Sequence, residues 1–251
     1  IQRLRNLTKR LKLPGGNVIT LVRFTDCKTN DFYHKCLQKL KLGNFVRWVD
    51  VDLGKLDYNE QIRKLKSTAL EYGGILLIGG SWYDVYDGEG EKFVQQIGPL
   101  ILDRTLDEDF PMASGFTCFA YQAIGDLIGK KIARDYALPV APVRVVAGAL
   151  DFGPGPVRLT SDGRQYPIFQ KTPSHVPDLW QVFWTTFTHG SWVIDTRVAD
   201  FFTKTEHLWK PLADSLLTGT HMMYGMPMGV ALQFHPEVHI TTEKAMRELM
   251  K

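Results

Sequence analysis

The sequence has few cysteines, and their spacing does not suit a disulfide framework or a metal site. Cys27, Cys36 and Cys118 are the three cysteines among 251 residues. An odd number without paired spacing argues against disulfides and predicts an intracellular, reducing compartment, either the cytoplasm or the mitochondrial matrix. Neither a Cys-x-x-Cys pair nor a His-Glu-x-x-His string is present. The sequence therefore predicts no zinc site, and it indicates no cofactor.

The sequence also lacks long apolar runs, internal repeats and low-complexity stretches. Without an apolar run of membrane-spanning length, we expect a soluble protein that does not cross a membrane. The first residue is Ile1 rather than Met, which suggests part of a longer or processed product. With 44% apolar and 23% charged residues, the composition is that of a globular chain with a sizeable core.

The net charge of +3 is small, and basic residues gather in one place only. The opening segment IQRLRNLTKRLK carries five basic residues and no acidic residue. Three interpretations stay open: a solvated leader helix, a contact to an anionic partner such as RNA made by residues 1–13, or the remnant of an Arg-rich targeting segment. We expect residues 1–16 to form a basic tail and residues 17–251 to form one domain.

The first half of the domain alternates between predicted strands and helices. Apolar runs predict strands over 17–24, 44–52, 73–80 and 110–117. Helical spacing predicts helices over 31–42, 58–71, 92–102 and 121–134, with Gly43 as a C-terminal cap of the first helix. This alternation favours right-handed βαβ units and a parallel sheet.

The second half favours short strands between Pro/Gly turns. We predict strands over 143–149, 157–160, 166–169, 180–187, 192–195 and 230–234, and turns over 153–156 and 161–163. Short helices are predicted over 198–202, 209–217 and 241–251. The expected fold class is α/β, with an open, mostly parallel central sheet flanked by helices and a smaller antiparallel strand region in the second half.

Cys118 lies where a predicted strand gives way to a predicted helix. This strand–turn–helix pattern is the geometry of a nucleophile elbow at the carboxyl end of a sheet. The N-terminus of the following helix would favour the reactive thiolate. Taken alone, Cys118 is better explained as a small buried core cysteine.

Two further segments carry candidate chemistry. In ALQFHPEV (residues 231–238) an apolar strand ends in His235, Pro236 and Glu237, where a carboxylate could orient an imidazole that acts as a base. The other interpretation is an exposed loop. Gly79 and Gly80 follow an apolar strand, and glycine amides there suit an oxyanion hole, although most Gly-Gly pairs are only turns.

Together and in this order, these segments resemble the class I glutamine amidotransferase family, whose patterns are a Gly-Gly turn, a G-x-C-x-G-x-Q elbow and a late His-Pro-Glu. The resemblance covers residues 17–240 and includes the segments at 151–163 and 187–193. It implies attack by a cysteine on the side-chain amide of glutamine or on a γ-glutamyl bond, through a thioester. The implied roles are nucleophile for Cys118, base for His235, orienter for Glu237, oxyanion donors for Gly80 and Phe119, and substrate positioning for Gln122, Thr188 and His189.

The sequence departs from the family pattern around the elbow. Phe116 and Ala120 occupy positions where the family has glycine, while Thr188 and Ser191 replace the usual Ser and Asp. Two main hypotheses follow: a hydrolase that acts alone or passes ammonia to a synthase partner, and a catalytically impaired protein that serves as an assembly component, for example of a mitochondrial ribonucleoprotein. A third, chemistry of the PfpI-like intracellular peptidase group, is disfavoured because that group lacks the late His-Pro-Glu.

Overall fold

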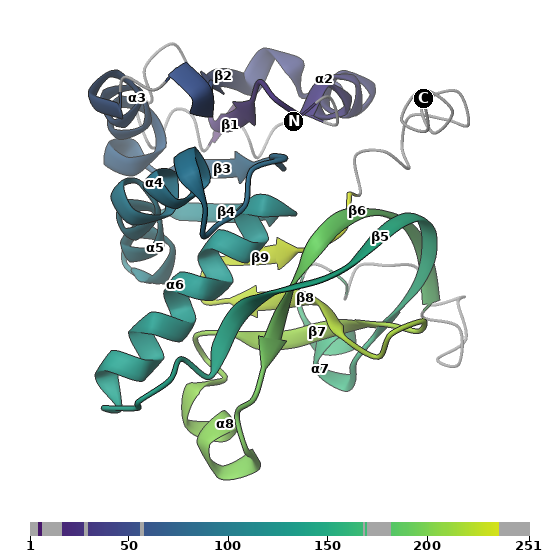
Figure 1. Cartoon of the computed structure of the whole chain (residues 1–251). Coiled ribbons are helices and arrows are strands. Elements are labelled where there is room, and N and C mark those ends of the chain that lie inside the picture. The colour runs from purple at the N-terminus through teal and green to yellow at the C-terminus, as the bar shows by residue number, and fades with distance from the viewer. Residues whose placement is uncertain are drawn as a thin grey trace.

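The fold is built on one nine-stranded mixed sheet. The computed structural model describes residues 5–6, 17–27, 30–55, 58–167, 169 and 182–235. Along the sheet the strands follow the order β2-β1-β3-β4-β9-β8-β7-β5-β6 (Figure 1). The first five are parallel to one another, and the remaining pairs are antiparallel. The predicted fold class, an open α/β sheet with a parallel centre and an antiparallel region, is confirmed.

The parallel half follows the predicted alternation of strands and helices. Its strands are β1 (Ile19–Phe24), β2 (Val46–Val51), β3 (Gly74–Ile78), β4 (Met112–Thr117) and β9 (Gly229–Leu232). Its helices are α2 (Asn30–Lys39), α3 (Tyr58–Leu65) with a π-helical continuation (Lys66–Leu70), α4 (Gly88–Gln96), α5 (Gly98–Leu106) and α6 (Phe119–Asp135). Short 3-10 turns occupy Gly43–Phe45 and Leu53–Lys55.

Helices cover both faces of the parallel strands. In β1, Val22 and Phe24 belong to the main core cluster, to which α3, α4, α5 and α6 contribute. Ile19 and Leu21, which point to the other face, join a smaller cluster with Leu37 of α2. Since side chains alternate along a strand, a strand between two helical layers needs apolar residues in succession, as this sequence has.

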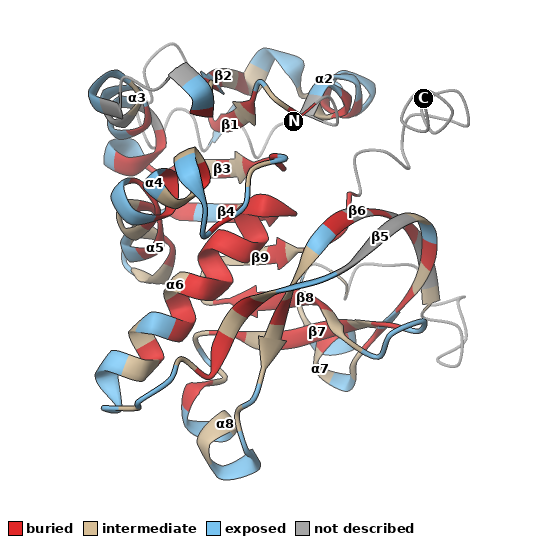
Figure 2. Cartoon of the chain, in the orientation of Figure 1, coloured by how far each residue is buried: buried red, intermediate tan, exposed pale blue. Residues whose placement is uncertain are grey.

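Helix α6 is buried over its first two turns on every side, from Phe119 through Asp126 (Figure 2). A Cβ on Gly129 would meet the carbonyl oxygen of Val143 at 1.7 Å, so only glycine lets α6 lie this close to β5. The helix that follows Cys118 is therefore held firmly against the sheet.

The antiparallel half contains β5 (Val143–Leu159), β6 (Val182–Asp195), β7 (Lys210–Ser215) and β8 (His221–Met226), with the short helices α7 (Ser161–Gln165) and α8 (Ala199–Thr205). The predicted turn over 153–156 is wrong, because these residues lie inside β5. They pair with β6 alone, whereas β7 joins β5 only from Val157 onward. A strand with one partner tolerates Pro154 and Pro156, which lack an N–H.

Other predictions for this half also fail. Residues 209–217 were expected to be helical, but most of them form β7. Trp209 is buried, and so are three successive residues of β7, Pro211, Leu212 and Ala213, where two irregularities in the β7–β8 pairing interrupt the usual alternation. The predicted turn over 161–163 is the start of α7, where Thr160 Oγ1 accepts from the N–H of Gly163. Tyr166, Pro167 and Phe169 form no strand, and β8 was not predicted.

Two helix boundaries differ from the prediction. Lys41, not Gly43, takes the left-handed conformation at the end of α2, with φ of 58°. The N–H groups of Lys41 and Leu42 donate to the carbonyls of Gln38 and Leu37, which closes a Schellman motif before Gly43 is reached. The single helix predicted over 92–102 is two helices, because Pro99 lacks the N–H that a continuous helix would use.

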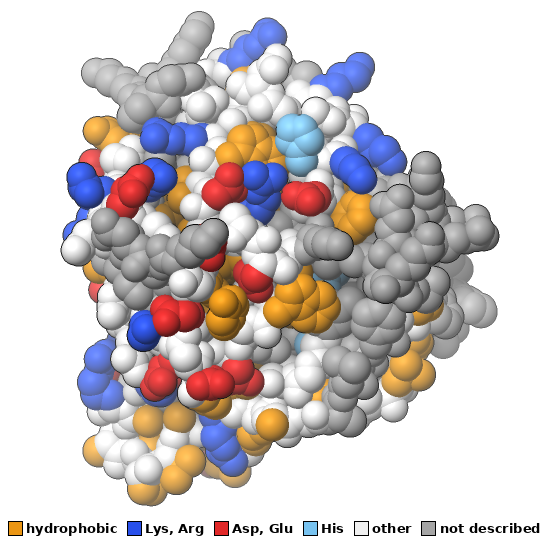
Figure 3. Space-filling view, turned by 45° about the horizontal axis from the view of Figure 1, so that its top comes forward, with side chains coloured by type: hydrophobic (Ala, Val, Ile, Leu, Met, Phe, Trp, Pro, Cys, Tyr) orange, Lys and Arg blue, Asp and Glu red, His pale blue; other side chains and the backbone are white. Residues whose placement is uncertain are grey.

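The surface carries both signs of charge. On the face in Figure 3, basic and acidic side chains are interspersed. Ion pairs such as Lys64–Glu60 and Lys131–Asp135 join residues one helical turn apart. Among the described residues no helix is long and apolar enough to cross a membrane. The basic segment at residues 1–16, apart from 5–6, and the helix predicted over 241–251 lie outside the described part of the chain.

Candidate functional site

The carboxyl ends of three neighbouring parallel strands bring the candidate residues together. Gly80 follows β3, Cys118 follows β4, and His235 lies three residues beyond β9. Because β3, β4 and β9 are adjacent in the sheet, their ends share one edge although 155 positions separate residue 80 from residue 235 in the sequence. Open parallel sheets place ligand sites at this edge.

Cys118 forms a sharp turn between β4 and α6. Its backbone has φ of 54° and ψ of −110°, and its N–H donates to the carbonyl of Leu232 in β9 at 2.8 Å. Positive φ is unfavourable for a residue with a Cβ, so the surrounding ladder and helix must hold it. The predicted strand–turn–helix geometry at Cys118 is present, and Cys118 is 5% exposed at the N-terminus of α6.

Gly80 lies directly against both Cys118 and His235. A Cβ at position 80 would be 3.0 Å from His235 Cε1, 3.2 Å from Cys118 Cβ and 3.6 Å from Cys118 Sγ. The thiol of Cys118 and the imidazole of His235 therefore both lie next to Gly80. His235 is fully buried. Glu237, the third member of the predicted triad, lies outside the described residues, so its role stays a prediction.

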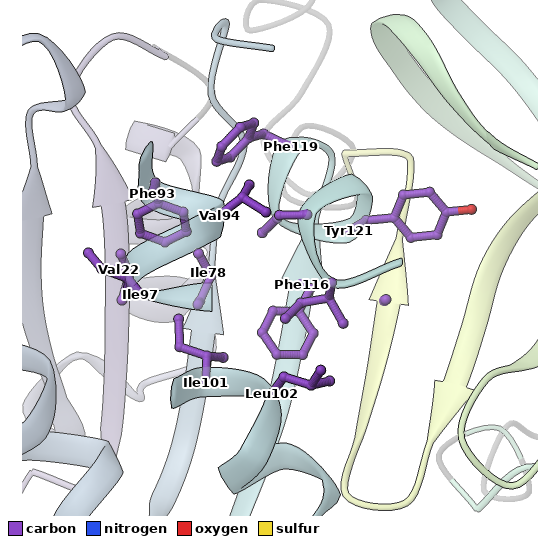
Figure 4. Packing of buried hydrophobic residues seen from close by; sticks show 14 of the residues in the cluster. Val22, Ile78, Phe93, Val94, Ile97, Ile101, Leu102, Phe116, Phe119 and Tyr121 are labelled. Atoms are coloured by element: carbon purple, nitrogen blue, oxygen red, sulfur yellow. The ribbon is translucent and has the colours of Figure 1, made fainter. Parts of the chain in front are cut away.

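The bulky ring of Phe116 does not separate these groups. Phe116 aligns with Ile78 in β3 and Ala231 in β9, and its side chain is buried in the main core cluster together with Ile101 and Leu102 of α5 (Figure 4). Ala120 is buried in the same cluster. Phe116 and Ala120, the two non-glycine residues at these positions, are thus packed in the core. Neither comes between Gly80 and its neighbours Cys118 and His235.

Phe119, the predicted oxyanion donor, begins α6. Its ring packs edge-on against Phe24, with ring centroids 5.3 Å apart, and tilts toward Phe93 at 5.9 Å. These contacts fix the first turn of the helix below Cys118. The N–H of a first-turn residue has no acceptor within its own helix, so it is suited to bind an anion.

Gln122 links three elements. Its Nε2 donates to the carbonyl of Ser191 in β6 at 2.9 Å and lies 3.4 Å from Gln233 Oε1, just beyond β9. Ser191 Oγ in turn donates to Asp84 Oδ2 in the loop after β3. The predicted substrate-positioning residue is thus a cross-link between α6, β6 and the segment that carries His235.

His189 of β6 is a second imidazole near His235. Burial and, to a smaller extent, the His235 ring lower the pKa of His189 to about 4, against a hydrogen bond with the Ser191 backbone that raises it. The ring packs edge-on against Trp192, with ring centroids 4.6 Å apart. His189 is therefore neutral at pH 7. Thr188 pairs with Phe152 of β5 through the backbone, and substrate positioning by Thr188 and His189 stays a prediction.

Comparison with known proteins bears on the fold alone. No family model matches the chain, and no curated protein matches it. The crystal structure of SMU.1228c is similar, with a TM-score of 0.56 over 92% of this chain and 81% of that one. The two chains share a fold. Their sequence identity is 14%, which is too low to transfer an activity.

Sequence reasoning missed Asp26, which holds the loop after Gly80. Asp26 Oδ2 accepts from Ser81 Oγ at 2.7 Å and from the N–H of Trp82 at 2.6 Å. An acidic residue two positions past β1 lies at the same sheet edge, and that placement was a usable signal. The hydroxyl of Tyr33 in α2 also hydrogen-bonds to Thr117 Oγ1, next to Cys118. No signal in the sequence points to that contact.

Among the described residues there is no group of three or more His, Cys, Asp or Glu side chains that could hold a metal ion. The chemistry open to this edge is that of a buried thiol, two imidazoles, the amides of two glutamines and a helix N-terminus.

Proposed function

We propose that this protein hydrolyses the side-chain amide of glutamine, or a γ-glutamyl amide bond, through a thioester on Cys118. The observation that carries the proposal is the positive φ of Cys118 at a strand–helix turn, with His235 and Cys118 both against Gly80. An unfavourable backbone conformation at a cysteine is unexpected for a residue that only fills the core, and strain of this kind is concentrated at active sites.

His235 is the candidate base. It takes the thiol proton as Cys118 Sγ attacks the amide carbon, and it returns that proton to the departing nitrogen. The expected role of Glu237 is to accept from the other ring nitrogen and fix the tautomer. The neutral His189 adds no positive charge beside His235, so it does not oppose the proton that His235 takes from the thiol.

The oxyanion that forms on the substrate needs donors on the side opposite the base. The backbone N–H groups of Gly80 and Phe119 are the candidates, one from the β3 turn and one from the first turn of α6. Each such donor lowers the barrier by roughly 3–4 kcal/mol in a measured protease case. The Phe119 N–H also benefits from the positive end of the α6 dipole.

The bond changes balance without a cofactor. A carbon–sulfur bond forms and the carbon–nitrogen bond breaks, which releases ammonia or an amine and leaves a γ-glutamyl thioester. Water, deprotonated by His235, then attacks the thioester carbon, and the thiol leaves with that proton. The products are glutamate and ammonia from glutamine, or glutamate and a free amine from a γ-glutamyl compound.

The test compares wild type with Cys118→Ser on glutamine and on γ-glutamyl-p-nitroanilide. Cys36→Ser is the matched control, since Cys36 is equally buried but belongs to α2. We expect release of ammonia and of nitroaniline by wild type and Cys36→Ser, and none by Cys118→Ser. Equal rates for all three proteins, or no turnover by any of them, would refute the proposal.

The second candidate is a catalytically impaired assembly component, favoured by the core-filling Phe116 and Ala120 and by the near-complete burial of Cys118 and His235. A glutamine-analogue affinity reagent separates the two: rapid, selective labelling of Cys118 argues for the hydrolase. RNA binding that weakens with salt and disappears when residues 1–13 are deleted would argue for the assembly role.

A further inference from the structure

Gln233 is a buried amide that the catalytic proposal does not use. It is 1% exposed and lies between β9 and His235, where its backbone N–H donates to the carbonyl of Met222 at 2.9 Å. Its side-chain Oε1 faces Gln122 Nε2. Its Nε2 has no hydrogen-bond partner within the described part of the chain.

The surrounding contacts fix which way this amide points. Gln122 Nε2 donates to the carbonyl of Ser191, which can only accept, so the NH₂ of Gln122 is identified. Gln233 must then present its oxygen to that NH₂, because two NH₂ groups facing each other would repel. The Gln233 NH₂ is consequently a buried donor directed away from Gln122.

Buried donors without an acceptor are rare in folded proteins, and such a group is expected to have an unobserved partner. Each of the two paired glutamines is close in the sequence to one reacting group. Gln233 precedes His235 by two residues, and Gln122 follows Cys118 by one helical turn, with the Gln122 N–H donating to the Cys118 carbonyl. We propose that Gln233 Nε2 binds the α-carboxylate of the substrate; this inference rests on the proposed function.

The spacing suits that ligand. One helical turn rises about 5.4 Å, and the four carbon–carbon bonds from the amide carbon of glutamine to its α-carboxyl carbon span roughly 5 Å when extended. With the amide carbon at Cys118, an extended substrate directed along α6 is long enough to span the one helical turn to Gln122, whose side chain faces Gln233. Because helical side chains lean toward the N-terminus, Gln122 is directed back toward Cys118.

The experiment uses two substrates that differ only in the carboxylate: γ-glutamyl-p-nitroanilide and 4-aminobutanoyl-p-nitroanilide. In Gln233→Leu we expect kcat/KM to fall about ten- to hundred-fold for the first, mainly through KM, as for a lost hydrogen bond to a charged group. For the second we expect less than a twofold change. An equal loss on both substrates would show that Gln233 is only structural and would overturn the inference.

Two further variants serve as controls for this comparison. Gln233→Glu keeps the oxygen that faces Gln122 and removes the donor, so it serves if Gln233→Leu does not fold, and it should show the same selectivity. Gln95→Leu removes an amide that bonds Glu91 on the exposed side of α4, and it should match wild type on both substrates.

A binding measurement tests this inference independently of the proposed reaction. By calorimetry, Cys118→Ser should bind L-glutamine with a lower Kd than 4-aminobutanamide, which lacks the carboxylate. Adding Gln233→Leu should remove this difference in Kd. Such a result supports the inference even if wild type shows no turnover. Turnover by wild type with no effect of Gln233→Leu on this preference would leave the hydrolase standing and the inference refuted. Failure of glutamine to bind would overturn the inference as well.

Discussion

Gly80 has no side chain, and the site leaves no room for one. Its Cβ would lie 3.0 Å from His235 Cε1, closer than the 3.4–4 Å of an ordinary contact, and 3.2 Å from Cys118 Cβ. The backbone of Gly80 has no positive φ. The effect of Gly80→Ala is therefore steric, and it acts on the two groups proposed to carry the reaction.

The size of the effect follows from these distances. The imidazole or the thiol must move by a few tenths of an ångström. Overpacking of this kind destabilises by about 1–3 kcal/mol, or about 2–4 °C in Tm for each kcal/mol in a chain of this size. Misplacing reacting groups by about 1 Å lowers rates about a hundred-fold. We expect kcat/KM of Gly80→Ala to fall at least ten-fold.

The assay measures kcat/KM with γ-glutamyl-p-nitroanilide and Tm by circular dichroism. Gly43→Ala is the matched control, because its Cβ would have one ordinary contact, with Gln38 Cγ at 3.9 Å, far from the sheet edge. It should keep wild-type activity and a Tm within a few degrees. A Gly80→Ala protein with both values unchanged would refute the close packing of Gly80, Cys118 and His235.

Three further predictions concern stability. Because Cys118 has φ of 54°, Cys118→Gly should be more stable than Cys118→Ala by about 1 kcal/mol in urea unfolding, the reverse of the order at ordinary positions. The opposite order would contradict the turn at Cys118. Ala137 has φ of 52°, so Ala137→Gly should likewise raise the free energy of unfolding by about 1 kcal/mol. For His189, whose pKa drops from 6.5 to about 4 on folding, the unfolded chain binds more protons in that range, so stability should fall by roughly 3 kcal/mol as the pH drops from 6.5 to 4. His189→Gln should flatten this slope, and a slope unchanged from wild type in that variant would show that His189 does not titrate in this way.

The parallel half could be predicted because its local signals agree with one another. The apolar runs at β1 and β3 are too short for buried helices and are bounded by turn residues, and the helices between them have their own periodicity. The antiparallel half failed where long-range pairing overrode local signals. Pro154 and Pro156 looked like a turn, and β7 looked like a helix, because the sequence does not show that β5 has one partner there or that β7 is irregular.

Residue types, the order of motifs and the strand–turn–helix pattern at Cys118 belong to the sequence alone, and they were enough to place Cys118 and His235 past the ends of two strands. Sequence also specified the α/β class, since strand and helix periods alternate along the chain. Only the tertiary structure decided that Phe116 turns into the core, that Gly80 touches both Cys118 and His235, and that Gln122 and Gln233 meet. Those contacts depend on the strand order β3-β4-β9, which is set by burial across the whole sheet and which no local segment encodes.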